Sequence, residues 1–447
     1  MIKLTPLLAT VAGAIVTLGA TGVVLAGSPG IAGDPNGDSG ARAPAGRGAQ
    51  GGAIVVDWNR ELLRIVQTPG AQPATVHPTR SFALLQTAIY DAVVTITRNT
   101  SPLLVSVDAP RDARPDAAAA AAGHTILSSL YPAMTPALDR QLADELARIP
   151  AGRQTDLGIK IGDNIAAQLL AARADDGSAA VPPPFRPGSL PGDYQPTPPG
   201  FVPPVFTHWA GVTPFVLRSA SQFRPAPPPA LTSDAYARAL NEVESLGRDT
   251  STTRTADETV VGRFWAPAIW NTWNAIAEDA AVAHHASLER AAALFAALDV
   301  TFADSAIAFY DAKYAYQLWR PISAIRLADT DGNPATIGDP TWTPLANTAP
   351  DPSYPGAHST ISAAGAAVLG AFFGDRDRIQ VTSPALPGVV RSFDRYSDVA
   401  IEAGLSRIFA GQHTRIDDVA GQQLGHDIAR FVLRETGLGP VGLGVRP

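Results

Sequence analysis

Two cationic side chains, Lys313 and Arg320, lie in an apolar part of the chain. They are seven residues apart, a spacing that places both on one face of a helix. Tyr316, Leu318 and Trp319 are their neighbours, so we expect the two cations to be partly buried. A buried cation requires an anion beside it, whereas the alternative interpretation is a solvated basic edge of a helix.

A second segment combines Arg407 with His413 and Asp417. The histidine and the aspartate are four residues apart, on or at the entrance of a predicted helix. This spacing lets the carboxylate accept from one imidazole nitrogen and leaves the other nitrogen free as a ligand or a nucleophile. An isolated pair of this kind is more often a surface ion pair.

A third segment lies between these two in the sequence, where Gly356 and Ala357 lead into an apolar helix predicted for residues 361–373. Free backbone N–H groups and the positive end of the helix dipole would face an anion at this entrance. His358 lies in the first turn and could transfer a proton.

Together the three segments supply two guanidinium groups, one ammonium group, a helix N-terminus and two histidines. Phosphoryl-type chemistry requires this set, because cations hold the equatorial oxygens, an in-line histidine attacks or ligates, and a second group acts as an acid. The combination predicts a pocket for a tetrahedral oxyanion, either phosphate or its analogue vanadate.

The three segments resemble the signature of the vanadium-dependent haloperoxidase and type 2 phosphatidic acid phosphatase superfamily. That signature is Lys, six residues, Arg-Pro; then Pro-Ser-Gly-His; then Ser-Arg, five residues, His, three residues, Asp. The first and third parts match in full, over residues 313–321 and 406–417. The resemblance extends through residues 264–265, residues 270–271 and the proline-rich region, so the chain is similar to the larger bacterial haloperoxidase-like members.

The resemblance implies a role for each matched residue and one vanadate per chain. Catalysis would involve His358 as acid or base, His413 as axial vanadium ligand or phosphoryl nucleophile, Lys313 as an aid to peroxide polarisation, and Asp417 as the group that orients His413. The oxyanion would be held by Lys313, Arg320, Arg407, His413 and the backbone of Gly356 and Ala357.

The middle segment departs from the family pattern at two places. Gly356-Ala357 replaces Ser-Gly, which removes a hydroxyl that would bind the oxyanion. Asp351 stands seven residues before His358, where family haloperoxidases often have an aromatic residue or a histidine near the halide. A carboxylate there would repel a halide.

Three functions remain open from the sequence. The favoured hypothesis is an exported vanadium-dependent haloperoxidase that oxidises a halide with hydrogen peroxide. The alternative is a secreted acid phosphatase that cleaves a phosphate monoester through a phosphohistidine. The third is a non-catalytic secreted binding protein, against which the retention of so many cations and histidines argues.

The elements that carry these segments are predicted to be helices, so the fold class is all-α. We expect an N-terminal helical half at residues 53–180 and a C-terminal half with the site at residues 231–447, as two bundles. A proline-rich crossover at residues 181–230 joins them, and four aromatic residues inside it indicate that it packs over the domain: Phe201, Phe206, Trp209 and Phe215. We find no convincing strand pattern.

The N-terminus has the pattern of an export signal at residues 1–26, or of an uncleaved membrane anchor, followed by a flexible linker at residues 27–52. We therefore expect a secreted, extracellular or cell-envelope protein that meets a membrane only through an uncleaved N-terminus. A homo-oligomer is compatible with the sequence. The net charge of −7 without a basic cluster argues against a nucleic-acid partner. The absence of cysteine excludes thiolate chemistry and disulfides.

Overall fold

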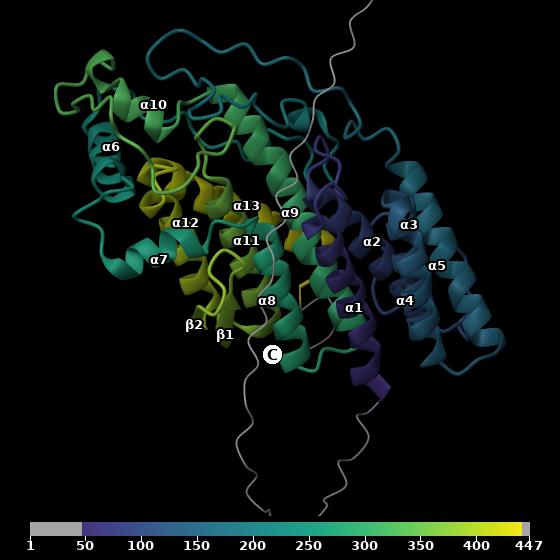
Figure 1. Cartoon of the computed structure of the whole chain (residues 1–447). Helices are drawn as coiled ribbons and strands as arrows, with labels where there is room; N and C mark the ends of the chain where they lie inside the picture. The colour runs from purple at the N-terminus through teal and green to yellow at the C-terminus, as the bar shows by residue number, and fades with distance from the viewer. Residues whose placement is uncertain (1–46, 440–447) are drawn as a thin grey trace, which may run out of the picture. The chain divides into compact units, whose positions relative to one another are not determined.

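The computed structural model describes residues 47–439 of the chain (Figure 1). The signal or anchor predicted at residues 1–26 lies outside the described residues, as does the predicted linker up to residue 46. The described part is mainly helical, which confirms the all-α class and the two helical bundles.

The N-terminal half consists of helices that pack on one another and on the core helix of the other half. Its elements are α1 (Arg47–Gln67), α2 (Pro78–Thr97), α3 (Pro115–Leu130), the 3-10 helix η1 (Pro132–Met134), α4 (Thr135–Ala147) and α5 (Arg153–Ala172). Proline opens α2 and α3 at the first helical position, where the missing N–H has no intrahelical partner to lose. Alanines 117–122 of α3 are buried and bring α3 close to α5 and α2.

Helix α1 begins within the segment that was predicted to be a flexible linker. It starts at Arg47, so residues 47–52 are helical rather than extended. At Gly52 a Cβ atom would lie 2.1 Å from the carbonyl oxygen of Ala286, so glycine allows α1 to approach the turn before α9 (Leu288–Tyr316). Here glycine serves close packing, which composition alone cannot distinguish from flexibility.

The proline-rich crossover contains the 3-10 helix η2 (Trp209–Gly211) and otherwise irregular backbone. Trp209 and Phe215 are buried, which confirms that the crossover packs against the helices, although Phe201 is 62% exposed. The carboxylate of Asp304 accepts the backbone N–H groups of residues 215, 216 and 217 at 2.6–2.9 Å. This buried carboxylate therefore anchors the end of the crossover to α9.

The C-terminal half is built around one long helix. Its elements are α6 (Asp234–Gly247), α7 (Ala256–Phe264), α8 (Ile269–Ala283), α9 (Leu288–Tyr316), α10 (Pro321–Arg326), the 3-10 helix η3 (Ala328–Thr330), α11 (Ala357–Phe373), α12 (Tyr396–Phe409) and α13 (Arg415–Thr436). Helix α9 contacts α1 and α2 on one side and α11 and α13 on the other, and Figure 1 shows it between the two groups. It is long and apolar enough to cross a membrane, but its apolar stretch is wholly buried among these helices.

Two strands that the sequence analysis missed follow α11. Strands β1 (Arg376–Thr382) and β2 (Val390–Arg395) pair antiparallel as a hairpin. In β1 the side chains of Ile379 and Val381 are buried, whereas their neighbours face solvent. This short alternation among charged residues is too weak to signal a strand from the sequence.

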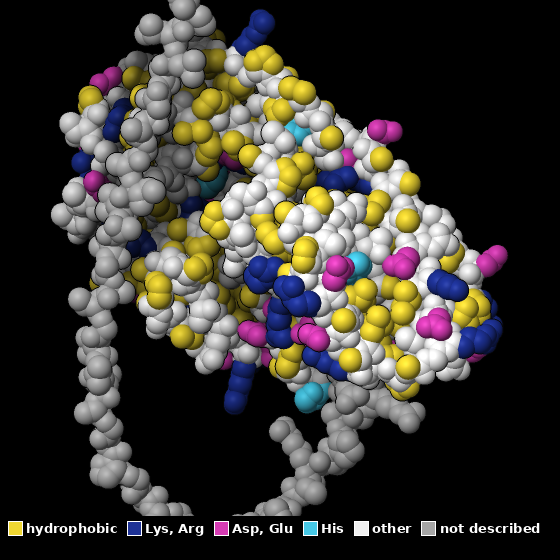
Figure 2. All heavy atoms as spheres, turned by 45° about the vertical axis from the view of Figure 1, so that its right-hand side comes forward, with side chains coloured by type: hydrophobic (Ala, Val, Ile, Leu, Met, Phe, Trp, Pro, Cys, Tyr) yellow, Lys and Arg dark blue, Asp and Glu magenta, His cyan; other side chains and the backbone are white. Residues whose placement is uncertain are grey.

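Charged side chains of the N-terminal half form local pairs. Figure 2 shows Lys and Arg beside Asp and Glu on this face rather than an extended basic patch. Examples are Arg64 with Glu61, and Arg148 with Glu145.

Candidate active site

The loop between α12 and α13 brings Arg407, His413 and Asp417 together. Helix α12 ends at Phe409, and the chain then turns at Gly411, whose φ is +74°. A Cβ atom at Gly411 would lie 2.5 Å from the carbonyl oxygen of Gly247, so this turn requires glycine. Thr414 caps α13 through a capping box with Asp417, which fixes the aspartate in the first turn of that helix.

His413 and Asp417 face each other as their spacing predicts. The His413 Nδ1 atom lies 3.4 Å from Asp417 Oδ2, and the same oxygen accepts the hydroxyl of Ser353 at 2.8 Å and the backbone N–H of Thr414 at 2.7 Å. With Nδ1 directed to the carboxylate, Nε2 is the ring nitrogen left to face the cations. Arg320 NH1 approaches this Nε2 atom at 3.1 Å.

Lys313 and Arg320 are brought together from two different helices. Lys313 lies in the last turn of α9, Gln317 ends that helix in the left-handed conformation, and Arg320 is the N-cap residue of α10. The prediction that one helix carries both cations is therefore wrong. The two side chains still converge, because both contact the carboxylate of Asp351. Both are buried, at 0% and 1% exposure.

Arg407 completes a cation cluster, which we define as Lys313, Arg320 and Arg407. Its NH1 group donates to the carbonyl of Trp265 at 3.2 Å, and its NH2 group donates to the side chain of Gln412. Its Nε atom is buried without a partner, and among the described residues no carboxylate pairs with this guanidinium. A buried guanidinium without a counter-ion favours binding of an anion.

The entrance of α11 carries the third segment. His358 lies in the first turn, and its Nε2 atom is 3.0 Å from the carbonyl of Trp265, which also accepts from Arg407. The backbone N–H of Ala357 has no acceptor among the described residues, whereas that of Gly356 donates to the carbonyl of Asp417 at 2.9 Å. Of these two residues, Ala357 has the free backbone donor, and the N–H of Gly356 is already used.

Burial shifts the pKa values of the site's basic groups downward. The pKa of Lys313 is lowered to about 8 by burial and by the neighbouring Arg320, although Asp351 opposes the shift. The pKa of Arg407 is lowered to about 9 by burial and by the neighbouring charge of Arg320. Arginine and lysine both remain protonated at neutral pH at these values.

Both histidines are neutral near pH 7 for similar reasons. Burial and the nearby Arg320 lower the pKa of His413 to about 3, although Asp417 opposes the change. Burial, Arg407 and His413 together hold the pKa of His358 well below its ordinary value. A neutral imidazole keeps one ring nitrogen with a free lone pair, as a metal ligand or a general base requires.

Two buried aspartates keep their charge in this setting. Burial acts to raise the pKa of Asp351, but Lys313 and Arg320 outweigh it and hold the value below the ordinary range. The pKa of Asp417 is likewise lowered, because hydrogen bonds from His413 and Thr414 outweigh its burial. With three cations, two carboxylates and neutral histidines, the site carries one net positive charge.

These features fit a tetrahedral oxyanion. The site has excess positive charge. In addition, the Nε–H of Arg407 and the backbone N–H of Ala357 have no acceptor among the described residues, so both can donate to an oxyanion. An imidazole nitrogen held toward the same cations can ligate a central atom. The predicted site residues thus lie together. Gly356 is the exception in its role, because its backbone N–H already donates to Asp417 and is not free for an oxyanion.

The sequence analysis assigned no role to several groups that complete the site. The hydroxyl of Ser353 donates to Asp417 and lies 3.4 Å from His413 Nδ1. Gln412 accepts from Arg407 through its side chain and from Arg320 through its backbone carbonyl. The carbonyl of Trp265 accepts from Arg407 and His358. Asp351 was expected beside a halide, but its carboxylate forms ion pairs with Lys313 and Arg320 of the cation cluster. Gln412 falls within the matched residues 406–417 and Ser353 lies three residues before Gly356, but nothing in their spacing indicates these contacts.

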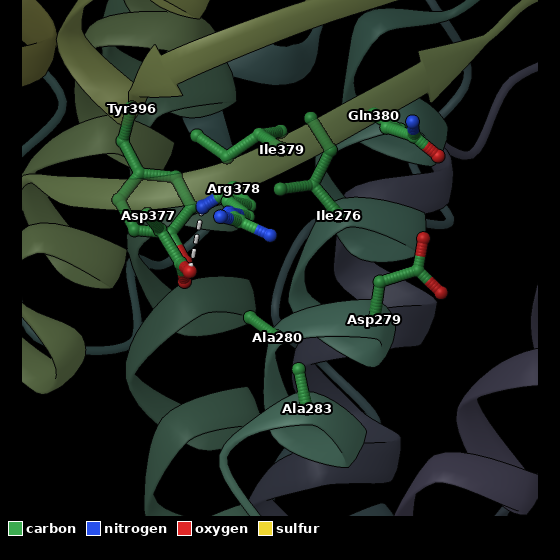
Figure 3. A pocket seen from close by; sticks show the side chains of 9 residues that line it. All are labelled: Ile276, Asp279, Ala280, Ala283, Asp377, Arg378, Ile379, Gln380 and Tyr396. Atoms are coloured by element: carbon green, nitrogen blue, oxygen red, sulfur yellow. Dashed lines mark hydrogen bonds between the residues drawn. The ribbon is translucent and has the colours of Figure 1, made fainter.

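A separate pocket lies away from these residues. It has a volume of about 410 Å³ between α8, β1 and Tyr396, and Figure 3 shows Asp279 and Asp377 among its lining side chains. None of the predicted site residues lines it. This pocket is therefore separate from the cation cluster.

Comparisons with known proteins point in one direction. A family model described as the VCPO second helical-bundle domain matches residues 293–437, a range that includes every predicted site residue. Vanadium chloroperoxidase from Curvularia inaequalis is 26% identical over 495 aligned positions, which cover 83% of this chain and 80% of that protein.

Two solved structures resemble the chain along most of its length. A bacterial vanadium-dependent iodoperoxidase superposes with a TM-score of 0.73 and 26% identity, covering 88% of this chain and 97% of that one. A holo-type bacterial vanadium-dependent chloroperoxidase gives a TM-score of 0.65 at 16% identity, covering 85% and 96%, and at that identity it shows the shared fold.

Proposed function

Because the chain belongs to the vanadium haloperoxidase superfamily, we propose that it is an exported vanadium-dependent haloperoxidase that oxidises a halide with hydrogen peroxide. The observation that carries the proposal is the buried cation cluster around the Nε2 atom of His413. The excess positive charge of this buried site supports binding of an oxyanion.

Each residue has a defined part in this proposal. Asp417 would keep a proton on Nδ1 of His413, so that the lone pair of Nε2, which faces Arg320 NH1 in the structure, would be the one that holds the vanadium. Arg407 and Arg320 would donate to the oxygens of vanadate, and Lys313 would add positive charge to the site. When bound, vanadate supplies the Lewis acid that activates hydrogen peroxide toward attack by the halide.

His358 is the group that would exchange a proton with hydrogen peroxide. Its Nε2–H donates to the Trp265 carbonyl, which leaves the lone pair on Nδ1. Because its pKa is low, the imidazole is neutral near pH 7, and Nδ1 is the ring nitrogen through which it would take part in proton transfer from hydrogen peroxide. Arg407 shares the Trp265 carbonyl, so the same backbone atom orients the base and one cation.

Export is part of the proposal and rests on the sequence of residues 1–26. N-terminal sequencing of the protein recovered from the culture medium tests it. A mature N-terminus near residue 27 is expected, whereas recovery of the intact chain in the membrane fraction would indicate an anchor.

Paired assays on the purified full chain test the reaction. We expect oxidation of iodide, bromide or chloride to require both hydrogen peroxide and added vanadate, and to be lost in His413→Ala. Hydrolysis of p-nitrophenyl phosphate is measured in parallel. Phosphate ester hydrolysis that vanadate inhibits, without oxidation of any of the three halides, would replace the proposal with the phosphatase alternative.

A further inference from the structure

We propose that Asp351 is an internal competitor that occupies part of the oxyanion site, and that its displacement from Lys313 and Arg320 sets how tightly this site binds an oxyanion. The inference rests on the proposed function for the location of the site. It concerns binding rather than turnover, so the two can be tested apart.

The ammonium of Lys313 has no proton left for an oxyanion. A lysine side chain has three N–H donors. In the structure they face Asp351 Oδ1 at 3.2 Å, the carbonyl of Pro352, and the carbonyl of Ser353 at 3.2 Å. Lys313 can therefore bind an oxyanion only after one of these acceptors leaves, and the Asp351 carboxylate is the only one of the three on a rotatable side chain.

Arg320 is nearly saturated as well. Its Nε atom donates to the backbone carbonyl of Asp351 at 2.7 Å, and NH1 faces the Gln412 carbonyl at 2.9 Å and His413 Nε2 at 3.1 Å. Its NH2 group donates to the Asp351 carboxylate. Of the five N–H donors of a guanidinium, one remains without an acceptor.

Arg407 provides the contrast. Among the described residues its contacts are a backbone carbonyl and the amide oxygen of Gln412, both uncharged, and its Nε atom has no partner there. The cation cluster thus has one member without a charged partner, and two members that share the single negative charge of Asp351. An incoming oxyanion can accept from Arg407 Nε without displacing another acceptor, whereas at Lys313 it must exchange with Asp351, which also occupies NH2 of Arg320.

The carboxylate can leave without unfolding its loop. The backbone of Asp351 has its own hydrogen bonds, from Arg320 Nε to its carbonyl and from its N–H to the carbonyl of Ala349 at 2.9 Å. Rotation of the side chain breaks the contacts with the two cations while these backbone bonds persist. Its retained negative charge still acts against the bound oxyanion at short range.

Calorimetric titration of the vanadate-free full chain with vanadate, and separately with inorganic phosphate, tests the proposal. Asp351→Asn keeps an oxygen acceptor in the same place and removes the charge, and Asp351→Ser is a second neutral variant should the first not fold. Asp351→Glu retains the charge. Glu242→Gln is the matched control, because it also removes one negative charge, from the Arg415 pair outside the cation cluster.

The neutral variants are expected to bind both anions about tenfold to a hundredfold more tightly than the wild type, since displacing a charged acceptor no longer opposes binding. Asp351→Glu and Glu242→Gln are expected to stay near the wild-type affinity. Wild-type or weaker binding in the folded neutral variants would overturn the role of Asp351 while leaving the oxyanion site in place. Absence of binding in the wild type and in every variant would overturn the proposed function as well.

Discussion

Asp417 shows how much of the site depends on a single side chain. Its Oδ2 atom faces His413, Ser353 and the backbone N–H of Thr414, so it orients the histidine and caps α13 with the same oxygen. Its Oδ1 atom is buried without a partner, so the hydrogen bonding of the carboxylate is concentrated on one oxygen. The catalytic and the structural contributions of this residue are therefore linked.

Asp417→Asn is expected to lower kcat/KM for halide oxidation by about tenfold to a hundredfold, as is typical when the partner of a ligating histidine is changed. Ser353→Ala, which removes one hydroxyl from the same oxygen, is expected to have a smaller effect. Steady-state kinetics at saturating vanadate measure both. An unchanged kcat/KM in folded Asp417→Asn would show that His413 does not need this carboxylate.

Gly356→Ser restores the hydroxyl of the family pattern at the entrance of α11. Gly356 has a φ of −70°, so serine fits the backbone without strain. A Cβ atom would lie 3.2 Å from the Asp417 carbonyl oxygen and 3.2 Å from Ser359 Oγ, so these neighbours must shift slightly. We expect vanadate binding to tighten by less than about tenfold, below the full value of a hydrogen bond to a charged group. Calorimetry that finds equal or weaker binding in the folded variant would show that this position does not face the oxyanion.

The residue types of the site could be predicted from the sequence, but not all of their partners. The convergence of four residues could be predicted, because each belongs to a motif with a recognisable spacing: Lys313, Arg320, Arg407 and His413. The position of Asp351 on Lys313 and Arg320 depends on how the loop before α11 folds over the end of α9. No local pattern encodes that contact.

At the scale of elements, the ends of helices place the functional groups. Lys313 is in the last turn of α9, Arg407 is in the last turn of α12, and His358 is in the first turn of α11. Helix ends have unpaired backbone groups and can turn the chain toward a common point. Helical spacing alone failed between Lys313 and Arg320, because Gln317 adopts a φ of +46° and ends α9 between them.

A buried polar contact between α1 and α8 gives the fold a pH dependence. Glu278 on α8 accepts from Asn59 at 2.7 Å and from Arg60 at 3.2 Å, and it is 6% exposed. Burial raises its pKa from 4.5 to about 7. The folded chain therefore binds more protons than the unfolded chain between these pH values, so the free energy of unfolding falls as the pH rises from 4.5 to about 7.

The expected loss from this one group is on the order of 3 kcal/mol, and Glu278→Gln should remove that part of the pH dependence. Urea unfolding of wild type and variant at several pH values across the interval measures it. Parallel pH profiles for the two proteins would show that Glu278 does not titrate in the folded state as described.

At the scale of the whole molecule, the two helical halves and the crossover could be predicted because their signals are long. Amphipathic repeats and runs of proline extend over many residues, so local errors average out. The hairpin of β1 and β2 was missed because its alternation is short and mostly polar. The start of α1 was missed because glycine and alanine can indicate either a flexible linker or a closely packed helix.

Phosphate in the buffer is expected to compete with vanadate for the whole enzyme, because both anions present tetrahedral oxygens to the same cations. Halide oxidation should therefore be slower in phosphate than in a non-coordinating buffer, and should recover as vanadate is added. The test is a vanadate titration at several phosphate concentrations. Activity that ignores phosphate at every vanadate level would contradict a shared pocket.

The amount of vanadium bound per chain tests the central claim most directly. The full chain and His413→Ala are incubated with vanadate, dialysed, and analysed for metal content, with circular dichroism to confirm that both are folded. The site described above predicts one vanadium per chain in the wild type and loss of the bound metal in the variant. Equal vanadium content in the two proteins would contradict the assignment of His413 and of the cation cluster as the vanadate site.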